Sequence, residues 1–195
     1  MSTITNRNSI SEALHDFLEI RETKGKGVGT YALKDIPKGS LVVIGRPLAI
    51  APVRTDMSFQ IDWNKHVELN DPAERINHSC DPNLGIRVNE FGGYNFIARR
   101  DIKKGEEITW CYPTSEYVSI AVKDCLCGTR ACTGKVTGWE DVPDHMKEKF
   151  MKEGFVAPFI MEKISFIVTR NRTDLPHPAF LQETLADTEL PEQDH

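Results

Sequence analysis

The chain has 195 residues, of which 39% are apolar and 27% charged, and its formal net charge is -5 at pH 7. These values fit one globular domain with its own core and a terminal extension. Without a basic excess the chain is poorly suited to neutralising phosphates, so we expect no direct nucleic-acid partner. Because it shows neither a membrane-length apolar run nor a secretion signal, we expect a cytoplasmic or nuclear protein that is not secreted and binds no membrane.

The first elements are short. Residues 9–20 carry apolar side chains at helical spacing, which fits a short amphipathic helix or the entry to a strand. Glycines alternate with other residues in segment 24–29, and such a loop lets a ligand approach the backbone, although a plain turn fits equally well. A strand-like run follows at residues 41–44. Prolines and brief apolar runs alternate through residues 47–69, which predicts short strands.

The loop at residues 75–83 reads Arg-Ile-Asn-His-Ser-Cys-Asp-Pro-Asn and is unusually dense in polar groups. It offers hydrogen-bond donors and acceptors to a polar ligand, and it carries the thiol of Cys80. The run Leu84–Val88, a turn at residues 89–93 and a strand at Tyr94–Ala98 follow it. This loop is the first candidate for a functional site.

An internal repeat relates residues 32–39 to residues 98–105. Both segments read Ala-x-x-Asp-Ile-x-Lys-Gly. Two copies are too few for a solenoid, so we interpret them as two similar strand–turn–strand units in a fold of short strands.

The C-terminal part is predicted to be helical. Residues 142–154 have proline near the start and glycine at the end of a helical pattern, and residues 158–168 could form a second helix. Residues 174–195 contain six acidic residues and no Lys or Arg. We expect this acidic tail to be flexible and solvated.

Five cysteines occur, at positions 80, 111, 125, 127 and 132. The last three form a C-x-C-x4-C pattern, which in a chain without a secretion signal favours zinc over a disulfide framework. Structural zinc takes four ligands, so one is missing from this cluster. Cys80, Cys111 or a histidine could supply it. Cys80 is the better candidate, because zinc would then anchor the polar loop to the downstream segment as a lid.

Four segments in order resemble the SET-domain methyltransferase family. They are the glycine loop at residues 24–29, the Asn-His-Ser-Cys-x-Pro-Asn signature at 77–83, Gly-Glu-Glu-Ile-Thr-Trp-Cys-Tyr at 105–112, and a C-x-C-x4-C motif of the post-SET type. The resemblance spans roughly residues 20–135. It implies a mainly β fold of several small sheets with some α structure, a knot-like crossing, a post-SET zinc segment and C-terminal helices. The corresponding boundaries are an N-terminal segment 1–17, a SET domain 18–113, a zinc segment 114–138, a helical extension 139–173 and the tail 174–195.

The resemblance also implies a site. The family binds S-adenosylmethionine, and the matching cofactor-binding residues are Lys26, Gly27, Val28, Asn77, His78 and Tyr112. Tyr112 matches the catalytic tyrosine, and Trp110 and Tyr94 are expected to line the substrate channel. One structural zinc ion is expected on Cys80, Cys125, Cys127 and Cys132, which leaves Cys111 as the odd thiol.

The expected reaction is methyl transfer from S-adenosylmethionine to a lysine side-chain amine of a protein or peptide. A neighbouring sulfonium and an apolar channel would lower the pKa of that amine and make it nucleophilic. Tyr112 would orient the amine and the transferred methyl group. One alternative is the same chemistry on a free amino acid or other small amine, and another is a zinc-stabilised binding module without catalysis.

Overall fold

The computed structural model describes residues 16–120 and 123–173. The chain divides into two compact units, Met1–Ile160 and Met161–His195, and the strands of the described residues lie in the first. In the second unit the described residues continue helix α3 (Pro158–Thr173). Most of the helix or strand entry expected at residues 9–20, most of the N-terminal segment 1–17, and the tail 174–195 lie outside the described residues.

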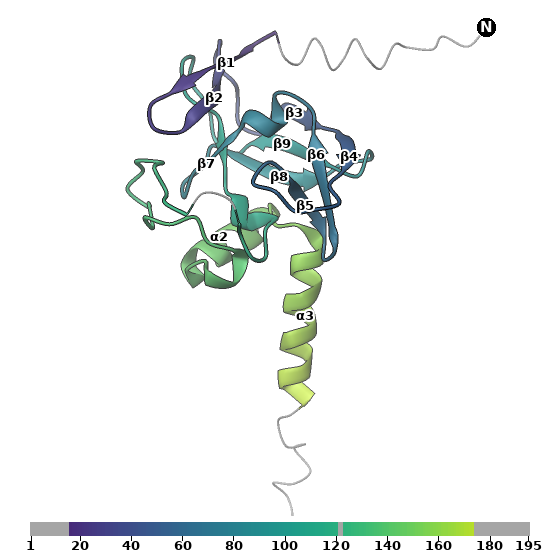
Figure 1. The fold of residues 1–195 in the computed structure, drawn as a ribbon. Helices are drawn as coiled ribbons and strands as arrows, with labels where there is room; N and C mark the ends of the chain where they lie inside the picture. Colours follow the sequence, from purple (N-terminus) through teal and green to yellow (C-terminus); the bar gives the residue numbers. More distant parts are fainter. Residues whose placement is uncertain (1–15, 121–122, 174–195) are drawn as a thin grey trace, which may run out of the picture. The chain divides into compact units, whose positions relative to one another are not determined.

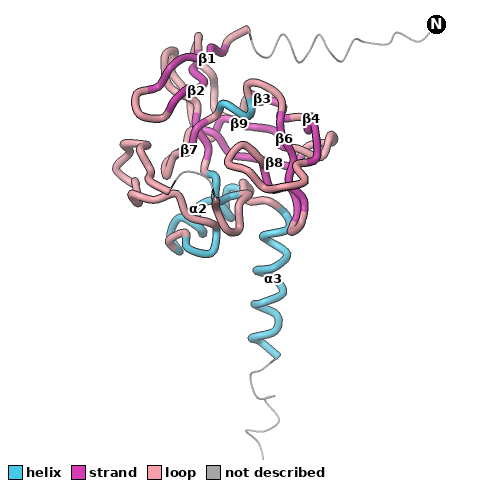
Figure 2. The backbone as a smooth tube through the Cα atoms, viewed as in Figure 1, coloured by secondary structure: helices cyan, strands magenta, loops and turns pink. Residues whose placement is uncertain are grey.

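The described residues form short strands in small sheets, joined mostly by loops (Figure 1; Figure 2). The sheets are β1 (Leu18–Thr23) with β2 (Gly27–Ala32); β3 (Leu41–Gly45), β9 (Tyr94–Ala98) and β8 (Leu84–Val88); β4 (Pro47–Ile50), β6 (Lys65–Leu69) and β5 (Phe59–Asp62); and β7 (Asn77–His78) with β10 (Thr109–Trp110). The expected strands at residues 41–44 and 94–98 are confirmed, and residues 47–69 form the brief strands predicted for them. The mainly β fold of several small sheets is therefore confirmed.

The sheet β3–β9–β8 carries a large part of the core. Strand β9 pairs with β3 and β8 in antiparallel register. Its Phe96, together with Val43 of β3 and Leu84 of β8, is fully buried. Trp110 of β10 meets the Phe96 ring edge-on, with ring centroids 5.6 Å apart. The sheet thus supports the chain segment that leads to Tyr112.

The two copies of the internal repeat pair with each other. Ile36 and Ile102 exchange backbone hydrogen bonds of 2.8 and 2.9 Å. The glycine N–H of each copy, residues 32–39 and 98–105, donates to the alanine carbonyl of the other copy. The aspartate of each copy accepts the lysine N–H of the other, at 2.8 and 2.9 Å. The repeat is therefore a reciprocal pair of turns.

Strands β7 and β10 run parallel and place the polar loop beside the segment before Tyr112. The N–H of Ser79 donates to the carbonyl of Trp110 at 2.9 Å. The Asn83 side chain accepts the N–H of Thr109 at 2.8 Å and donates to the carbonyl of Glu107 at 2.9 Å. The two segments that the resemblance brings together lie side by side.

The predicted helix at residues 142–154 is confirmed as α2 (Asp144–Glu153), and the second helix extends to Thr173. Gly154 ends α2 in the left-handed conformation, with φ 71°. The Phe155 ring then packs on Gly85 of β8, where a Cβ atom would lie 2.2 Å from the ring. Arg99 donates to Glu153 at 2.6 Å. Helix α2 is thus held against the sheets.

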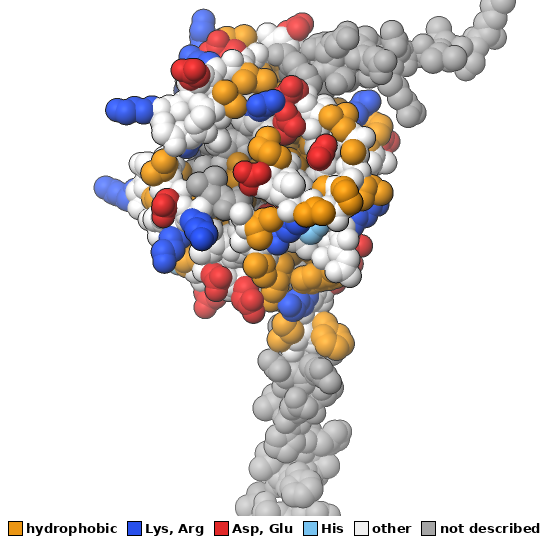
Figure 3. Space-filling model, viewed as in Figure 1, with side chains coloured by type: hydrophobic (Ala, Val, Ile, Leu, Met, Phe, Trp, Pro, Cys, Tyr) orange, Lys and Arg blue, Asp and Glu red, His pale blue; other side chains and the backbone are white. Residues whose placement is uncertain are grey.

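Short 3-10 helices complete the first unit: η1 (Ala73–Arg75), η2 (Tyr112–Thr114) and η3 (Trp139–Asp141). On the face drawn in Figure 3, Lys and Arg side chains are interspersed with Asp, Glu and hydrophobic side chains. Among the described helices, none combines the length and the hydropathy that crossing a membrane requires.

Candidate active site and metal centre

Tyr112 lies where the polar loop and strand β10 meet. It begins η2, with one residue between it and the end of β10, and its backbone N–H donates to Nδ1 of His78 at 3.2 Å. Its hydroxyl donates to the carbonyl of Ile76 at 3.2 Å. Burial raises the pKa of the Tyr112 hydroxyl above its ordinary value, so the phenol keeps its proton at neutral pH. Tyr112 is therefore positioned as a neutral hydroxyl beside Asn77 and His78.

His78 links the backbone of Tyr112 to the cysteine cluster. Burial, and then the nearby charge of Lys26, lower the pKa of His78 to about 4, so the imidazole is neutral at physiological pH. Because its Nδ1 accepts the N–H of Tyr112, the ring proton belongs on Nε2. Nε2 lies 3.5 Å from Sγ of Cys80. The ring thus faces Tyr112 with one nitrogen and the cluster with the other.

The glycine loop between β1 and β2 contacts the polar loop through side chains. Lys26 donates to Oε2 of Glu107 at 2.5 Å, and both side chains are partly buried. The amide nitrogen of Asn77 donates to the carbonyl of Val28 at 2.9 Å and to Oε1 of Glu107 at 2.8 Å. Gly27 has φ 73°, a backbone conformation that suits glycine. The predicted cofactor residues of the loop and of the signature are therefore neighbours.

Two cavities lie beside the predicted cofactor-binding residues. One, of about 190 Å³, is lined among others by Gly25, Lys26, Asn77, His78, Tyr112 and Leu126. The other, of about 230 Å³, is lined among others by Lys26, Phe59, Arg75, Asn77, Trp110 and Tyr112. Lys26, Asn77 and Tyr112 belong to both walls. Ligands in the two cavities would meet at these three side chains.

The two residues expected in the substrate channel have different positions. Trp110 lines the larger cavity and packs against Phe59, with ring centroids 5.7 Å apart. Tyr94 is fully buried, and its hydroxyl donates to the carbonyl of Gln60 at 2.5 Å. The placement of Tyr94 in the channel is therefore corrected: strand β9 turns this side chain into the core, and Phe59 provides the aromatic wall beside Trp110.

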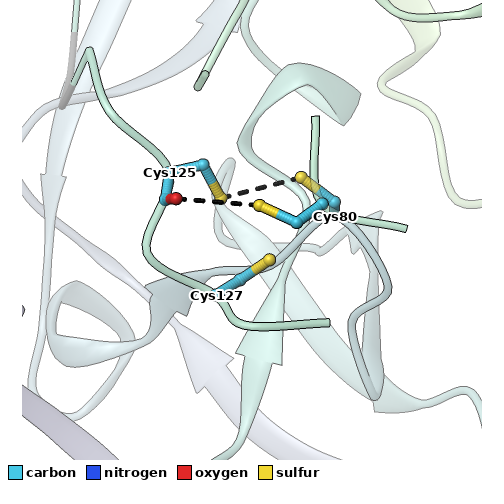
Figure 4. A group of neighbouring side chains, drawn as sticks. Cys80, Cys125 and Cys127 are labelled. Atoms are coloured by element: carbon cyan, nitrogen blue, oxygen red, sulfur yellow. Dashed lines mark hydrogen bonds between the residues drawn. The ribbon is translucent and has the colours of Figure 1, made fainter. Parts of the chain in front are cut away.

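Four thiols converge into one group. The sulfur atoms of Cys80, Cys125, Cys127 and Cys132 all lie within 4.8 Å of one another. Figure 4 shows the side chains of Cys80, Cys125 and Cys127 turned toward a common space. Cys111 is buried and is not part of this group of four. Among the fourth ligands left open by spacing alone, the structure selects Cys80.

The geometry of the thiols fits zinc. Tetrahedral zinc with Zn–S bonds of about 2.3 Å would hold its sulfur ligands about 3.8 Å apart. The sulfur atoms of Cys80 and Cys125 are 3.7 Å apart. Four thiolates close a tetrahedral site without an open position, which is typical of a structural ion. The cluster would fasten the polar loop to the segment that carries Leu126 in the wall of the smaller cavity.

Several wall residues were missed by the sequence-based prediction. Phe59 lies in a segment without a motif, and Leu126 lies within the C-x-C-x4-C motif but is not one of its cysteines, so only the tertiary structure shows that both face a cavity. Arg75 lines the larger cavity and stands at the start of the polar loop, where the sequence analysis gave it no role. Glu107 lines neither cavity, but it pairs with the wall residue Lys26 and was also given no role. Their charge beside a polar signature was the available signal.

Comparison with known proteins identifies the family. The model of the SET domain matches residues 27–113. Methyltransferase flvH of Aspergillus flavus is 30% identical over 145 residues, which are 69% of this chain and 81% of that protein. The histone-lysine N-methyltransferase of Mycosarcoma maydis that is specific for H3 lysine-36 is 28% identical over 62% of this chain. The chain spans only 14% of that relative's length.

Solved structures show the same fold. The chain matches KRYPTONITE, solved in complex with mCHG DNA and SAH, with a TM-score of 0.51 and 23% identity over 61% of this chain and 28% of that one. It also matches a structure solved to explain the product specificity of histone lysine methyltransferases, with a TM-score of 0.50 and 24% identity over 70% of this chain and 64% of that one. The match to the SET-domain model, and the 30% identity to a methyltransferase that the chain spans over 81% of its length, establish the family. The chain belongs to the SET-domain methyltransferases.

Proposed function

We propose that this protein transfers methyl groups from S-adenosylmethionine to the side-chain amine of a lysine in a protein. The observation that carries the proposal is the shared wall of the two cavities, formed by Lys26, Asn77 and Tyr112. A cofactor held by the glycine loop and the signature would meet an amine at the Tyr112 hydroxyl. The family supports the cofactor, and the relative from Mycosarcoma maydis is named for lysine methylation.

The residues of the chain have distinct roles in this proposal. S-Adenosylmethionine, when bound, supplies a methyl group on a sulfonium. Lys26, Gly27, Val28, Asn77 and His78 would hold it, and Tyr112 would touch both cofactor and amine. The protonated Tyr112 hydroxyl keeps its hydrogen on the carbonyl of Ile76, so its oxygen can accept an N–H of the incoming amine. This contact would orient the nitrogen lone pair, and orientation supplies much of the acceleration in such a reaction.

The aromatic wall would keep water away from the amine. Phe59 and Trp110 stack at an interplanar angle of 15°, and Trp110 approaches the Tyr112 ring to 5.0 Å between centroids. A neutral amine is favoured over its ammonium in such apolar surroundings. The amine would therefore enter along Phe59 and Trp110 and become nucleophilic close to Tyr112.

We also propose the division of the chain that the family suggests. Residues 18–113 would form the SET domain, residues 114–138 the zinc segment with Cys125, Cys127 and Cys132, and residues 139–173 the helical extension. The cysteine cluster supports one structural zinc ion in this segment. The contacts of α2 with the sheets make the first part of the extension a support of the SET domain.

A second candidate is methyl transfer to a free amino acid or other small amine. The relative that this chain spans over 81% of its length is named only a methyltransferase. In addition, the segment between β4 and the polar loop contains only β5, β6 and η1. It therefore offers little structure for a groove that would hold a long peptide.

The deciding experiment incubates the protein with methyl-labelled S-adenosylmethionine and, separately, with a peptide array and with free lysine. Label on array lysines supports the first candidate, and label on free lysine alone supports the second. Absence of label on every amine, with the cofactor still bound, would sink both and leave the non-catalytic zinc-stabilised module.

A further inference from the structure

Glu107 connects two residues of the proposed cofactor site, although the motif that contains it gave it no role. Its Oε2 atom accepts the ammonium of Lys26 at 2.5 Å, and its Oε1 atom accepts the amide N–H of Asn77 at 2.8 Å. Its own backbone is held by the Asn83 side chain at 2.9 Å. One carboxylate thus ties the glycine loop to the polar loop.

The contact with Glu107 fixes which end of the Asn77 amide faces a ligand. The Asn77 nitrogen carries two N–H groups, and both have acceptors, the carbonyl of Val28 at 2.9 Å and Glu107. The flipped amide would place its oxygen against two oxygen atoms, so the observed orientation is enforced. Asn77 therefore offers the cavities a hydrogen-bond acceptor.

The same carboxylate also fixes the charge at the boundary of the two cavities. Lys26 lines both cavities, and its ammonium uses one of its three N–H groups on Glu107. The side chains of Lys26 and Glu107 are only 16% and 17% exposed. An ion pair so little exposed is costly to break on one side, because the remaining charge loses its partner.

The fold reserves room for this carboxylate at Gly29. A Cβ atom at position 29 would lie 2.7 Å from Oε1 of Glu107, 2.8 Å from the amide nitrogen of Asn77 and 2.6 Å from Oγ1 of Thr23. These distances are well below a van der Waals contact. A residue larger than glycine at position 29 would therefore displace Glu107 or Asn77.

We propose that Glu107 is a positioning residue that sets the polarity of the cofactor site. It presents the Asn77 oxygen as an acceptor for the ammonium or hydroxyl groups of the cofactor, and the Lys26 ammonium as a donor for its carboxylate. The inference rests on the proposed use of S-adenosylmethionine. It predicts that Glu107 governs affinity for the cofactor and not affinity for the acceptor amine.

The test compares Glu107→Gln with Glu106→Gln. A glutamine has one carbonyl oxygen at its end, so at position 107 it can accept from Lys26 or from Asn77 but not from both. Glu106 is the matched control, because it is the preceding residue, loses the same charge, and pairs with the exposed Arg100 at 2.8 Å. Both variants are measured for calorimetric affinity for S-adenosylhomocysteine, for melting temperature, and for KM of cofactor and acceptor.

The inference predicts that Glu107→Gln weakens binding of S-adenosylhomocysteine roughly tenfold or more, as loss of a charge-assisted contact should. KM for the cofactor should rise by a similar factor, while KM for the acceptor stays within about twofold. Glu106→Gln should change none of these by more than about twofold. Lys26→Met, which removes the donor itself and leaves the Glu107 carboxylate without its cationic partner, should weaken binding of S-adenosylhomocysteine at least as much as Glu107→Gln.

Hydrogen exchange of the ligand-free protein distinguishes a local change at Asn77 from a general loss of folding. The side-chain amide protons of Asn77, followed by NMR, should exchange with water slowly in the wild type and faster in Glu107→Gln. Equal affinities of the two glutamine variants, or an effect on the acceptor KM alone, would overturn the inference and leave the proposed function standing. A wild-type protein that binds neither S-adenosylmethionine nor S-adenosylhomocysteine would overturn both.

Discussion

The phenolic oxygen of Tyr112 lies 3.2 Å from the carbonyl oxygen of Ile76, the residue directly before Asn77 in the signature. The Tyr112→Phe variant removes this hydroxyl but keeps the ring. We expect methyl transfer to fall by roughly a hundredfold or more, since an orienting polar group is lost at the reacting amine. Affinity for S-adenosylhomocysteine should stay within about threefold.

The matched control is Tyr117→Phe. Tyr117 packs edge-on against Trp63, with ring centroids 5.1 Å apart. This variant should retain methyl transfer. If Tyr112→Phe kept full activity, the assignment of Tyr112 would be wrong.

The four cysteines should bind one zinc ion per chain. Cys132→Ser should reduce zinc content, measured by mass spectrometry of the metal, because the remaining three thiolates leave the tetrahedral site incomplete. Chelation of the wild type should also weaken binding of S-adenosylhomocysteine, since the cluster anchors the segment around Leu126 at the smaller cavity.

Cys111→Ala serves as the control for the metal site. Cys111 is buried but lies outside the group of four, so this variant should keep its full zinc content. Unchanged cofactor affinity after verified zinc removal would contradict the coupling between the cluster and the cavity.

Tyr94 should affect stability in a pH-dependent way. Burial raises the pKa of Tyr94, so the folded protein keeps a proton that the unfolded chain releases above about pH 10. This contribution is fully present below about pH 10 and is lost as the pH rises further toward the folded pKa. Denaturant unfolding should show a steeper loss of stability between about pH 9 and about pH 11 in the wild type than in Tyr94→Phe.

At neutral pH the Tyr94→Phe variant should be less stable by about 1 kcal/mol, because the buried carbonyl of Gln60 loses its donor. Its methyl transfer should be close to that of the wild type, since Tyr94 lies in the core. A selective loss of transfer at unchanged stability would restore Tyr94 to the substrate channel.

Gly85→Ala should loosen α2 from the sheets. The new Cβ atom would lie 2.2 Å from the Phe155 ring, so the ring must move. We expect a loss of roughly 1–3 kcal/mol in the free energy of unfolding, as for other overpacked sites. Gly92→Ala is a comparison at a turn, where a Cβ atom meets nothing within 4 Å but the backbone has φ 79°. Equal stability of Gly85→Ala and the wild type would show that Phe155 does not hold this position.

The sequence was sufficient for the strands because they are short and bounded by proline, glycine and asparagine, which leave local signals. It was sufficient for the three cysteines at 125, 127 and 132, because thiols are rare and their spacing restricts the geometry. The fourth ligand was open between Cys80, Cys111 and a histidine, with Cys80 preferred, until the family resemblance named Cys80. The structure separates these residues, because Cys80, which follows strand β7, lies in the group of four thiols, while Cys111 is buried outside it.

Contacts between residues distant in the chain could not be predicted from the sequence. Tyr94 was expected to line a channel, but the direction of a side chain on strand β9 depends on which face of the sheet is covered. Phe59 occupies the aromatic wall from a segment without any motif. The role of Glu107 follows only from its contacts with Lys26 and Asn77, two residues that are distant from it in sequence.

The reciprocal turns at residues 32–39 and 98–105 impose an order on how the protein can fold. Each turn takes backbone hydrogen bonds from the other copy, so the first copy cannot be completed while the second is still missing. A nascent chain must therefore emerge beyond Gly105 before the first turn can make its hydrogen bonds with the second. Closing so long a loop is entropically costly and slow. Fragments that end before this point should be substrates for chaperones and proteases, even though they contain the glycine loop and the complete polar signature.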